Sequence, residues 1–309
     1  MQLKATIAAV AAVAGLAAAV PAQAAVLAMG DLAISNFLLI DTDTNTAITS
    51  IDISSEGRTG NATALYNGVP GPGPVSVNVI GSGPANVPYQ CSGQCGSILG
   101  AYGGVLENNL TSHIMTPIAD YALGDMVITG TAISLGANAL TRTNAASTGS
   151  TNNGNANATI INGVTAKTTF TVDTSIDNAA FTLNYDAFVK AFVSVDAFAG
   201  FASAGNSWSL TVTKIGGILP ADGFQTLSWM PSELNVGYTS GQFADNAEFL
   251  QAGALTSPTR TLTTGTYQLT VVQASNATIS ERVPEPSSLL LAGLAMVGLG
   301  AARRRMAMK

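Results

Sequence analysis

Two cysteines and one histidine carry the most distinctive chemistry in this 309-residue chain. Cys91 and Cys95 are separated by three residues, among them Gly93, so a short disulfide loop could close between them. A redox-active pair more commonly has Cys-x-x-Cys spacing, and a zinc site needs further ligands, whereas His113 is the only histidine. We therefore expect a structural disulfide if the chain enters an oxidising compartment. Catalysis through His113 is disfavoured, because no G-x-S-x-G turn is present.

Oxygen-bearing side chains alternate just after the apolar run that ends at residue 40. Asp41, Asp43 and Asn45 are spaced like the start of a calcium loop, and Asp52 occupies the twelfth position. The sixth position of such a loop is glycine, but here it is Thr46. Asp and Asn also form turns readily, because their side chains accept hydrogen bonds from the nearby backbone. The sequence favours a turn, with a weak calcium site at these four oxygen donors as the alternative.

Four aromatic residues could instead recognise sugars. Trp208, Trp229, Tyr185 and Tyr238 would suffice for a platform that stacks on the apolar faces of sugar rings. Both tryptophans lie inside strand-like runs, where aromatic side chains more often belong to the core. We expect core positions for them, and exposed stacking is the alternative. Thr-x-Thr pairs also recur, and ordinary strand propensity explains them. These pairs are at 42–44, 44–46, 211–213, 261–263 and 264–266.

Most of the chain between residues 25 and 282 has the pattern of β-strands. Apolar and polar residues alternate, or β-branched residues cluster, between Gly, Asn and Pro breaks. The stretches 101–111 and 243–251 are compatible with short helices, and the polar stretch 142–159 predicts a mobile loop. The chain is therefore predicted to be all-β, with an antiparallel β-sandwich or jelly-roll-like body. The predicted strands are 34–40 and 47–53 (a hairpin), 74–80, 125–135, 167–173, 179–185, 187–198, 208–215, 224–230 and 265–275.

Residues 1–24 have the organisation of a secretory signal peptide. Lys4 precedes an apolar stretch, Ala5–Val20, which predicts an N-terminal signal helix. Ala22-Gln23-Ala24 is a small-x-small cleavage site. The sequence therefore predicts export, with signal peptidase cutting between Ala24 and Ala25.

Residues 283–309 combine a Pro-Glu-Pro triplet, a short apolar run and an arginine cluster. The apolar run, Leu289–Ala302, has 14 residues, whereas a lasting transmembrane helix needs about 20. In this order the segment resembles the PEP-CTERM sorting signal. The resemblance implies a short, transiently inserted transmembrane helix and cleavage near the triplet by exosortase, a membrane-embedded cysteine protease. An uncut single-pass anchor is the alternative. The sorting residues are Pro284, Glu285, Pro286, Arg303, Arg304 and Arg305.

The body between these two signals is acidic but sparsely charged. Residues 25–284 contain 17 Asp and Glu against 7 Lys and Arg, a difference of −10. Because phosphate binding needs clusters of Lys and Arg, this composition argues against nucleic acid and anionic lipid as partners. No pattern for a cofactor or a resident metal is present in the sequence.

Several loose motifs of the body also resemble a family of exosortase-dependent surface proteins. They include CSGQCG at 91–96, YALGDMVITG at 121–130 and WMPSELN at 229–235. The resemblance implies a surface or extracellular-matrix protein and supplies no catalytic residues. We expect a secreted, non-enzymatic protein of the cell surface or biofilm, associated with exopolysaccharide. The alternatives are a carbohydrate-binding β-sandwich module, with or without a requirement for calcium, and, last, an unrecognised hydrolase.

Overall fold

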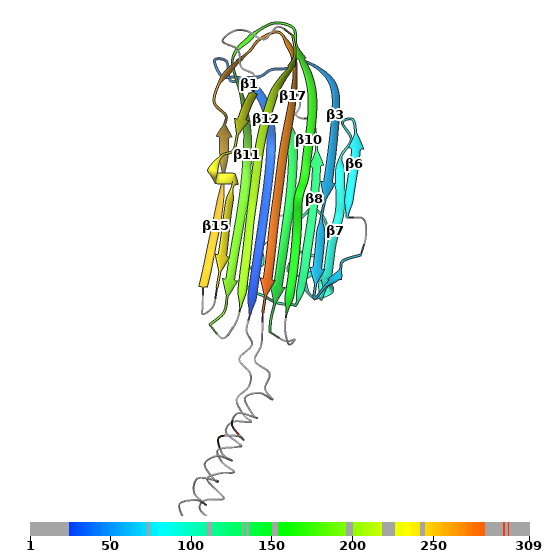
Figure 1. The fold of residues 1–309 in the computed structure, drawn as a ribbon, viewed down its shortest axis with the longest axis vertical. Helices are drawn as coiled ribbons and strands as arrows, with labels where there is room; N and C mark the ends of the chain where they lie inside the picture. The colour runs from blue at the N-terminus through cyan, green and yellow to red at the C-terminus, as the bar shows by residue number, and fades with distance from the viewer. Residues whose placement is uncertain are drawn as a thin grey trace, which may run out of the picture.

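The computed structural model is a sandwich of two antiparallel β-sheets with long strands (Figure 1). It describes residues 25–72, 75–109, 113–131, 133, 136–149, 154–195, 200–217, 226–241, 245–281, 293 and 296. The predicted all-β, antiparallel class is confirmed. The predicted signal helix and the sorting residues near the C-terminus lie outside the described residues.

No helix in the described part of the chain is long and apolar enough to cross a membrane.

The first layer, sheet A, contains the N-terminal strand at its centre. Two short strands extend it, β2 (Thr46–Ala47) beside β1 and β16 (Arg260–Leu262) beside β11. The order of its main strands is β15 (Asp245–Thr256), β11 (Ile176–Val193), β1 (Val26–Asp41), β9 (Ala137–Ser147), β8 (Tyr121–Thr129) and β7 (Ala85–Gly93).

The second layer, sheet B, contains the last strand at its centre. The order of its main strands is β13 (Thr226–Trp229), β12 (Phe201–Gly216), β17 (Gly265–Ser280), β10 (Asn155–Val172), β3 (Asp52–Asn61) and β6 (Ser76–Ile80). The remaining elements are β14 (Val236–Ser240) beside β12, β4 (Thr63–Tyr66) beside β10, β5 (Val69–Pro70) beside β4, α2 (Cys95–Ile98) and the 3-10 helix η1 (Ser232–Leu234).

Strand β17 shows how the period-2 pattern of the sequence becomes a two-sided layer. Buried and partly exposed residues alternate along its whole length after Thr266. Tyr267, Leu269 and Val271 point into the sandwich, and the intervening polar residues point to solvent. Successive side chains of a strand alternate between faces, so this sequence can bury one face of the sheet and solvate the other.

The interior has an aromatic zone and an alanine-rich zone. In the first zone Phe37 stacks on Phe181 at a centroid distance of 5.6 Å and meets Trp208 edge-on at 6.1 Å. The second zone lies nearer to the end of the sandwich where β1 begins. Its small side chains allow the sheets to approach closely. They include Ala28, Ala145, Ala156, Ala158, Ala191, Ala202, Ala204 and Ala277.

The backbones of the two sheets meet between these zones at Gly30. A Cβ atom placed there would lie 2.8 Å from the carbonyl oxygen of Gly205 and 3.0 Å from that of Asn276. Buried polar side chains bond across the same level. Asn206 Nδ2 donates to the carbonyl oxygen of Asp31 at 2.6 Å, and Ser275 Oγ donates to Asn206 Oδ1 at 2.8 Å. Polar groups can be buried here because they form hydrogen bonds with one another.

The same polar level extends along β9 and β17. Gln273 Nε2 donates to the carbonyl oxygen of Leu32 at 2.8 Å and to Thr141 Oγ1 at 3.0 Å. The hydroxyl groups of Thr141 and Ser275 lie 2.8 Å apart. We call Asn206, Ser275, Thr141 and Gln273 the inter-sheet polar layer. It holds the two sheets in one relative position.

Three local predictions were wrong, and a fourth is confirmed only in part. The polar stretch 142–159 belongs mostly to β9 and β10, because the outer side of β9 is covered and its polar residues bond there. Within 243–251 the expected helix is strand β15, because Phe249 and Leu255 both face the core at an even spacing. Residues 101–109 form turns rather than a helix. The expected 34–40/47–53 hairpin is confirmed only beside its turn, where the end of β1 pairs antiparallel with β2. Residues 52 and 53 belong to β3, which joins the other sheet.

We expect Gly30→Val to destabilise the fold by about 3 kcal/mol or more, because overpacking against rigid backbone forces the two sheets apart. The matched control is Gly57→Val on β3, where the nearest atom to an added Cβ is the carbonyl oxygen of Val79 at 3.9 Å. Urea unfolding followed by circular dichroism measures both variants. Equal midpoints for the two would show that the sheets do not meet at Gly30.

Candidate functional site

Residues 94–109 and 113–120, here called the covering segment, lie over the outer face of sheet A. Ile98, Tyr102 and Ile114 of this segment form a buried cluster with Leu27 and Phe188 of the sheet. A disulfide between Cys91 and Cys95 joins the end of β7 to the start of the segment. The outer face of sheet A is therefore a second hydrophobic interior.

Arg142, on the outer side of β9, fastens the covering segment to the sheet. Its guanidinium is fully buried, lies 3.5 Å from Asp125 Oδ2 and sits 4.6 Å from the ring centroid of Tyr102. The same group donates to the backbone carbonyl oxygens of Leu106 and Asn109. A buried charge of this kind is tolerated because it is paired and hydrogen-bonded.

His113 belongs to the same buried network. Its Nδ1 lies 3.1 Å from Asp31 Oδ2, and its ring stacks on Phe188 at 4.1 Å. Burial lowers the pKa of His113, but the hydrogen bond and charge of Asp31 outweigh burial, and the net pKa is raised. Burial raises the pKa of Asp31. Among the described residues no serine, threonine or cysteine side chain bonds to His113. The pair has the geometry of a salt bridge that holds the covering segment.

The oxygen donors after β1 stabilise a turn. Asp41 Oδ1 accepts the backbone N–H of Asp43 at 2.9 Å, and Asp43 Oδ2 accepts a hydrogen bond from Asn178 Nδ2 at 2.9 Å. Asn45 has a φ of 52°, a value that Asn tolerates in turns. Asp52 lies apart, at the start of β3 in the other sheet. Over the described ranges no group of three or more His, Cys, Asp and Glu side chains could hold a metal ion.

Two of the four aromatic residues predicted for a stacking platform are buried, whereas Trp229 and Tyr238 are half-buried. Trp208 is buried in the core and meets Trp229 edge-on at 5.2 Å. Tyr185 is also buried. A sugar ring cannot reach the face of Trp208, so stacking on this residue is excluded.

Among the described residues no segment covers the central strands of the outer face of sheet B, and this face is almost uncharged. We call the outward side chains of its three central strands the hydroxyl face, and Lys167 is its one charged member. Its polar members are Ser203, Ser207, Ser209, Thr211 and Thr213 on β12, Thr266, Gln268, Thr270, Asn276, Thr278 and Ser280 on β17, and Asn155, Asn157, Thr159, Thr165, Lys167, Thr169 and Thr171 on β10.

Strand pairing brings these side chains into rows across the sheet. Thr211 lies opposite Thr270 and Thr270 opposite Lys167, while Ser203 lies opposite Thr278 and Thr278 opposite Asn157. Neighbouring strands are about 4.8 Å apart, and successive outward residues of one strand are about 6.8 Å apart. The hydroxyl face is therefore a regular two-dimensional array of donors and acceptors.

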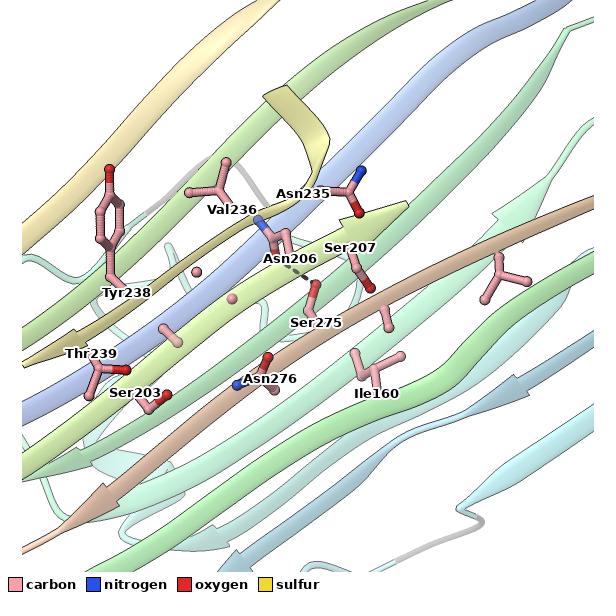
Figure 2. A pocket seen from close by; sticks show the side chains of 15 residues that line it. Ile160, Ser203, Asn206, Ser207, Asn235, Val236, Tyr238, Thr239, Ser275 and Asn276 are labelled. Carbon is pink, nitrogen blue, oxygen red and sulfur yellow. Dashed lines mark hydrogen bonds between the residues drawn. The ribbon is translucent and has the colours of Figure 1, made fainter. Parts of the chain in front are cut away.

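A hollow of about 600 Å³ opens in this face beside β14 (Figure 2). Gly205, Gly237 and Ala274 provide little side chain to fill it. Asn235 fixes one side, because its amide accepts from the backbone N–H of Trp208 at 3.1 Å and donates to the carbonyl oxygen of Trp208 at 3.0 Å. The polar residues around the hollow are Ser203, Asn206, Ser207, Asn235, Thr239, Ser275 and Asn276, and none of the residues that line it is charged.

The two ends of the folded body lie together. The backbone N–H of Ala25 donates to Ser194 Oγ at 2.8 Å, and β1 begins at the next residue. The backbone N–H of Glu281, directly after β17, donates to the carbonyl oxygen of Gly154 at 2.7 Å. β1 begins and β17 ends at the same end of the sandwich (Figure 1). Of the predicted processing residues, Ala25 is described, whereas Ala24 and the six sorting residues lie outside the described part.

Sequence reasoning missed the buried network and the hydroxyl face. A usable signal for the network was the presence of Asp31 and Asp125 inside apolar strand-like runs, because buried carboxylates require partners. Arg142 was overlooked as a partner because its surroundings are polar and look like a loop. The hydroxyl face had only the scattered Thr-x-Thr pairs as a signal, and their alignment depends on which strands are neighbours.

We expect the free energy of unfolding to fall as pH rises from about 4 to about 7. Burial, only partly offset by Arg142, raises the pKa of Asp125 from 3.8 to about 7. A carboxyl group whose pKa is raised by folding stabilises the fold fully when the pH is below its pKa in the unfolded chain. This stabilisation, at most about 4 kcal/mol, is lost as the pH rises through the pKa in the folded protein. Burial raises the pKa of Asp31 and Glu281 in the same direction. The pKa of His113 is also raised, so stability falls further as the pH rises above the ordinary pKa of histidine.

Thermal unfolding of the mature protein, followed by circular dichroism between about pH 4.5 and about pH 8, measures this dependence. Asp125→Asn should flatten it, and Asp177→Asn, at an exposed position near the start of β11, should not. A melting temperature that rises with pH in the parent protein would contradict the assignment.

Comparison with known proteins identifies the C-terminal segment. The family model of the PEP-CTERM protein-sorting motif matches residues 282–305. No curated protein and no solved structure matches the chain significantly. The matched residues include the Pro-Glu-Pro triplet, the apolar run and the arginine cluster. The chain is therefore a PEP-CTERM sorting-domain protein, exported to the cell surface or the extracellular space as a target of exosortase.

Proposed function

We propose that the mature protein is a non-enzymatic component of the extracellular matrix that adheres to neutral exopolysaccharide through the hydroxyl face. The observation that carries this proposal is the chemistry of that face, an ordered array of hydroxyl and amide groups with a single charge, Lys167. Serine, threonine, asparagine and glutamine side chains both donate and accept hydrogen bonds, as sugar hydroxyl groups do. An extended neutral polymer could bond to several rows at once.

The hollow supports the same ligand class. It is polar, uncharged and open along the sheet, so a sugar unit could enter it without desolvating a charged group. Trp208 has no accessible face, and Tyr238 is the aromatic residue that lines the hollow. Adhesion would therefore rest mainly on hydrogen bonding. Weak contacts repeated along a polymer add up through effective concentration.

Removal of the sorting tail makes such adhesion necessary for retention. Once exosortase has cut near Pro284, the body has no membrane segment of its own among the described residues. A matrix protein would then be held at the surface by the body alone. Adhesion to exopolysaccharide supplies that attachment.

The proposal that the protein is not an enzyme rests on the surroundings of its titratable groups. His113, Asp31, Asp125 and Arg142 pair with one another or with backbone beneath the covering segment. General acid–base catalysis requires such groups within hydrogen-bond reach of a substrate. The residues around the hollow of sheet B include no Asp, Glu, His, Cys or Lys.

Co-sedimentation of the mature protein with the purified exopolysaccharide of the producing cells tests this function. We expect retention by the polymer, unchanged by a calcium chelator. Ala274→Phe should fill the hollow and weaken binding about tenfold, which corresponds to about 1.4 kcal/mol. The matched control is Asn184→Phe, an exposed strand position of sheet A.

A second pair of variants tests the array outside the hollow. Thr270→Asp places a carboxylate in the centre of the hydroxyl face, and Asn184→Asp places one on sheet A. The first should weaken binding and the second should not. A parent protein that passes through the polymer unretained, or equal retention of all four variants, would refute the proposed role of this face.

A further inference from the structure

Strand β15 forms one border of sheet A, at the outer edge of the sandwich in Figure 1. It pairs with β11 over all 12 of its residues without a register shift. The backbone N–H of Ser257, the residue after β15, donates to the carbonyl oxygen of Phe181 at 2.8 Å. This bond shows which residues of β15 form hydrogen bonds with β11. In an antiparallel pair, hydrogen-bonded and non-hydrogen-bonded positions alternate. The odd-numbered residues of β15 therefore bond to β11.

The even-numbered residues direct their backbone groups away from the sheet. Within the described part of the chain no hydrogen bond reaches these groups. Several of the side chains are exposed, and Leu250 is 62% exposed. The strand thus presents a continuous row of free donors and acceptors. The residues are Asn246, Glu248, Leu250, Ala252, Ala254 and Thr256.

The other borders of the two sheets are protected against such pairing. β7 contains Pro88 and shifts register between Val87 and Gln90. β6, β13 and β14 have five, four and five residues. Proline, bulges and short length are the usual ways in which proteins blunt a sheet edge. β15 has none of these features, and it contains no lysine or arginine.

We propose that β15 pairs antiparallel with β15 of a second copy of the protein, so that sheet A continues across both copies. A two-fold axis at Gln251 would place Leu250 opposite Ala252 of the second copy, Glu248 opposite its Ala254 and Asn246 opposite its Thr256. All free backbone groups of both strands then bond, and the exposed side chain of Leu250 gains an apolar neighbour. The interface is the same surface on each copy, as two-fold symmetry requires.

The charges of β15 favour a second copy in this orientation. Its two acidic residues, Asp245 and Glu248, both lie near its first end. Antiparallel pairing places them at opposite ends of the interface, whereas parallel pairing would set them against each other. Glu248 Oε2 also lies 2.8 Å from Lys190 Nζ of its own copy, so its charge is already paired.

The two-fold axis has consequences for the faces and the chain ends. Both hydroxyl faces lie on the same side of the pair, because residues opposite each other in an antiparallel ladder point to the same side. The ends that carry Ala25 and Glu281 lie at opposite ends of the pair, about 40 Å apart by the length of 12 residues of strand.

Sedimentation velocity of the mature protein purified from the producing cells tests the pairing. We expect a dimer that becomes a monomer with Ala252→Pro, because this N–H is unused within one copy and its loss leaves the β11 ladder intact. The matched control is Asn78→Pro on β6. The N–H of Gly81 donates to the carbonyl oxygen of Glu56, so the odd-numbered residues of β6 are those that bond to β3. The N–H of Asn78, an even-numbered residue, therefore also points away from the neighbouring strand. Both variants should keep the circular dichroism of the parent, and only the first should lose the dimer.

The register is tested by cysteine substitution. Gln251→Cys should form a disulfide between copies, because the two-fold axis sets the two cysteines opposite each other at a non-hydrogen-bonded position, where side chains are close. Ala247→Cys should not, because it would face Leu255. A monomeric parent protein at all concentrations, a dimer that survives Ala252→Pro, or failure of Gln251→Cys to cross-link would each overturn the proposal. These outcomes are independent of binding to exopolysaccharide.

Discussion

The backbone contact between the two sheets at Gly30 and Gly205 is the constraint on which the rest of this structure depends. At the level of this contact the interior has no room for side chains, so bulky aromatic groups collect on one side of it and alanines on the other. Burying bare backbone at a sheet interface is possible only if nearby polar groups are satisfied. Asn206 and Gln273 satisfy several of these groups by donating from sheet B to carbonyl oxygens of sheet A.

The same contact explains the shape of the outer surface of sheet B. The inner side of Gly205 faces the contact between the sheets, and its outer side lines the hollow. The lack of a side chain at this residue therefore permits both the close contact and the hollow. A Cβ atom at this position would lie 3.1 Å from Asn276 Oδ1 and 3.2 Å from the carbonyl oxygen of Val236. The hollow is therefore a consequence of how closely the sheets pack as well as a feature of the proposed binding face.

The two outer faces of the sandwich have different chemistry because only one of them is covered. On sheet A the covering segment buries Asp31, which pairs with His113, and Asp125, which pairs with Arg142. On sheet B the central strands remain open and carry hydroxyl and amide groups. A protein with few charges can thus keep a soluble open face without salt bridges, since hydroxyl and amide groups are well hydrated. The uncovered face and the edge strand β15 are the two surfaces that we propose for partners.

Much of what the sequence alone determined rests on local patterns. Strand periodicity predicted the all-β class, and the order of parts around Pro284 predicted the sorting signal, because each pattern lies within a short window. The tertiary structure decided what depends on distant partners. Thr211, Thr270 and Lys167 form a row only because β12, β17 and β10 are neighbours, and no local pattern specifies that order. The stretch around Arg142 is a strand only because a segment far away in the sequence covers it. Strand propensity reflects such surroundings more than the residue itself, which is why the helix expected at 243–251 proved to be the edge strand β15.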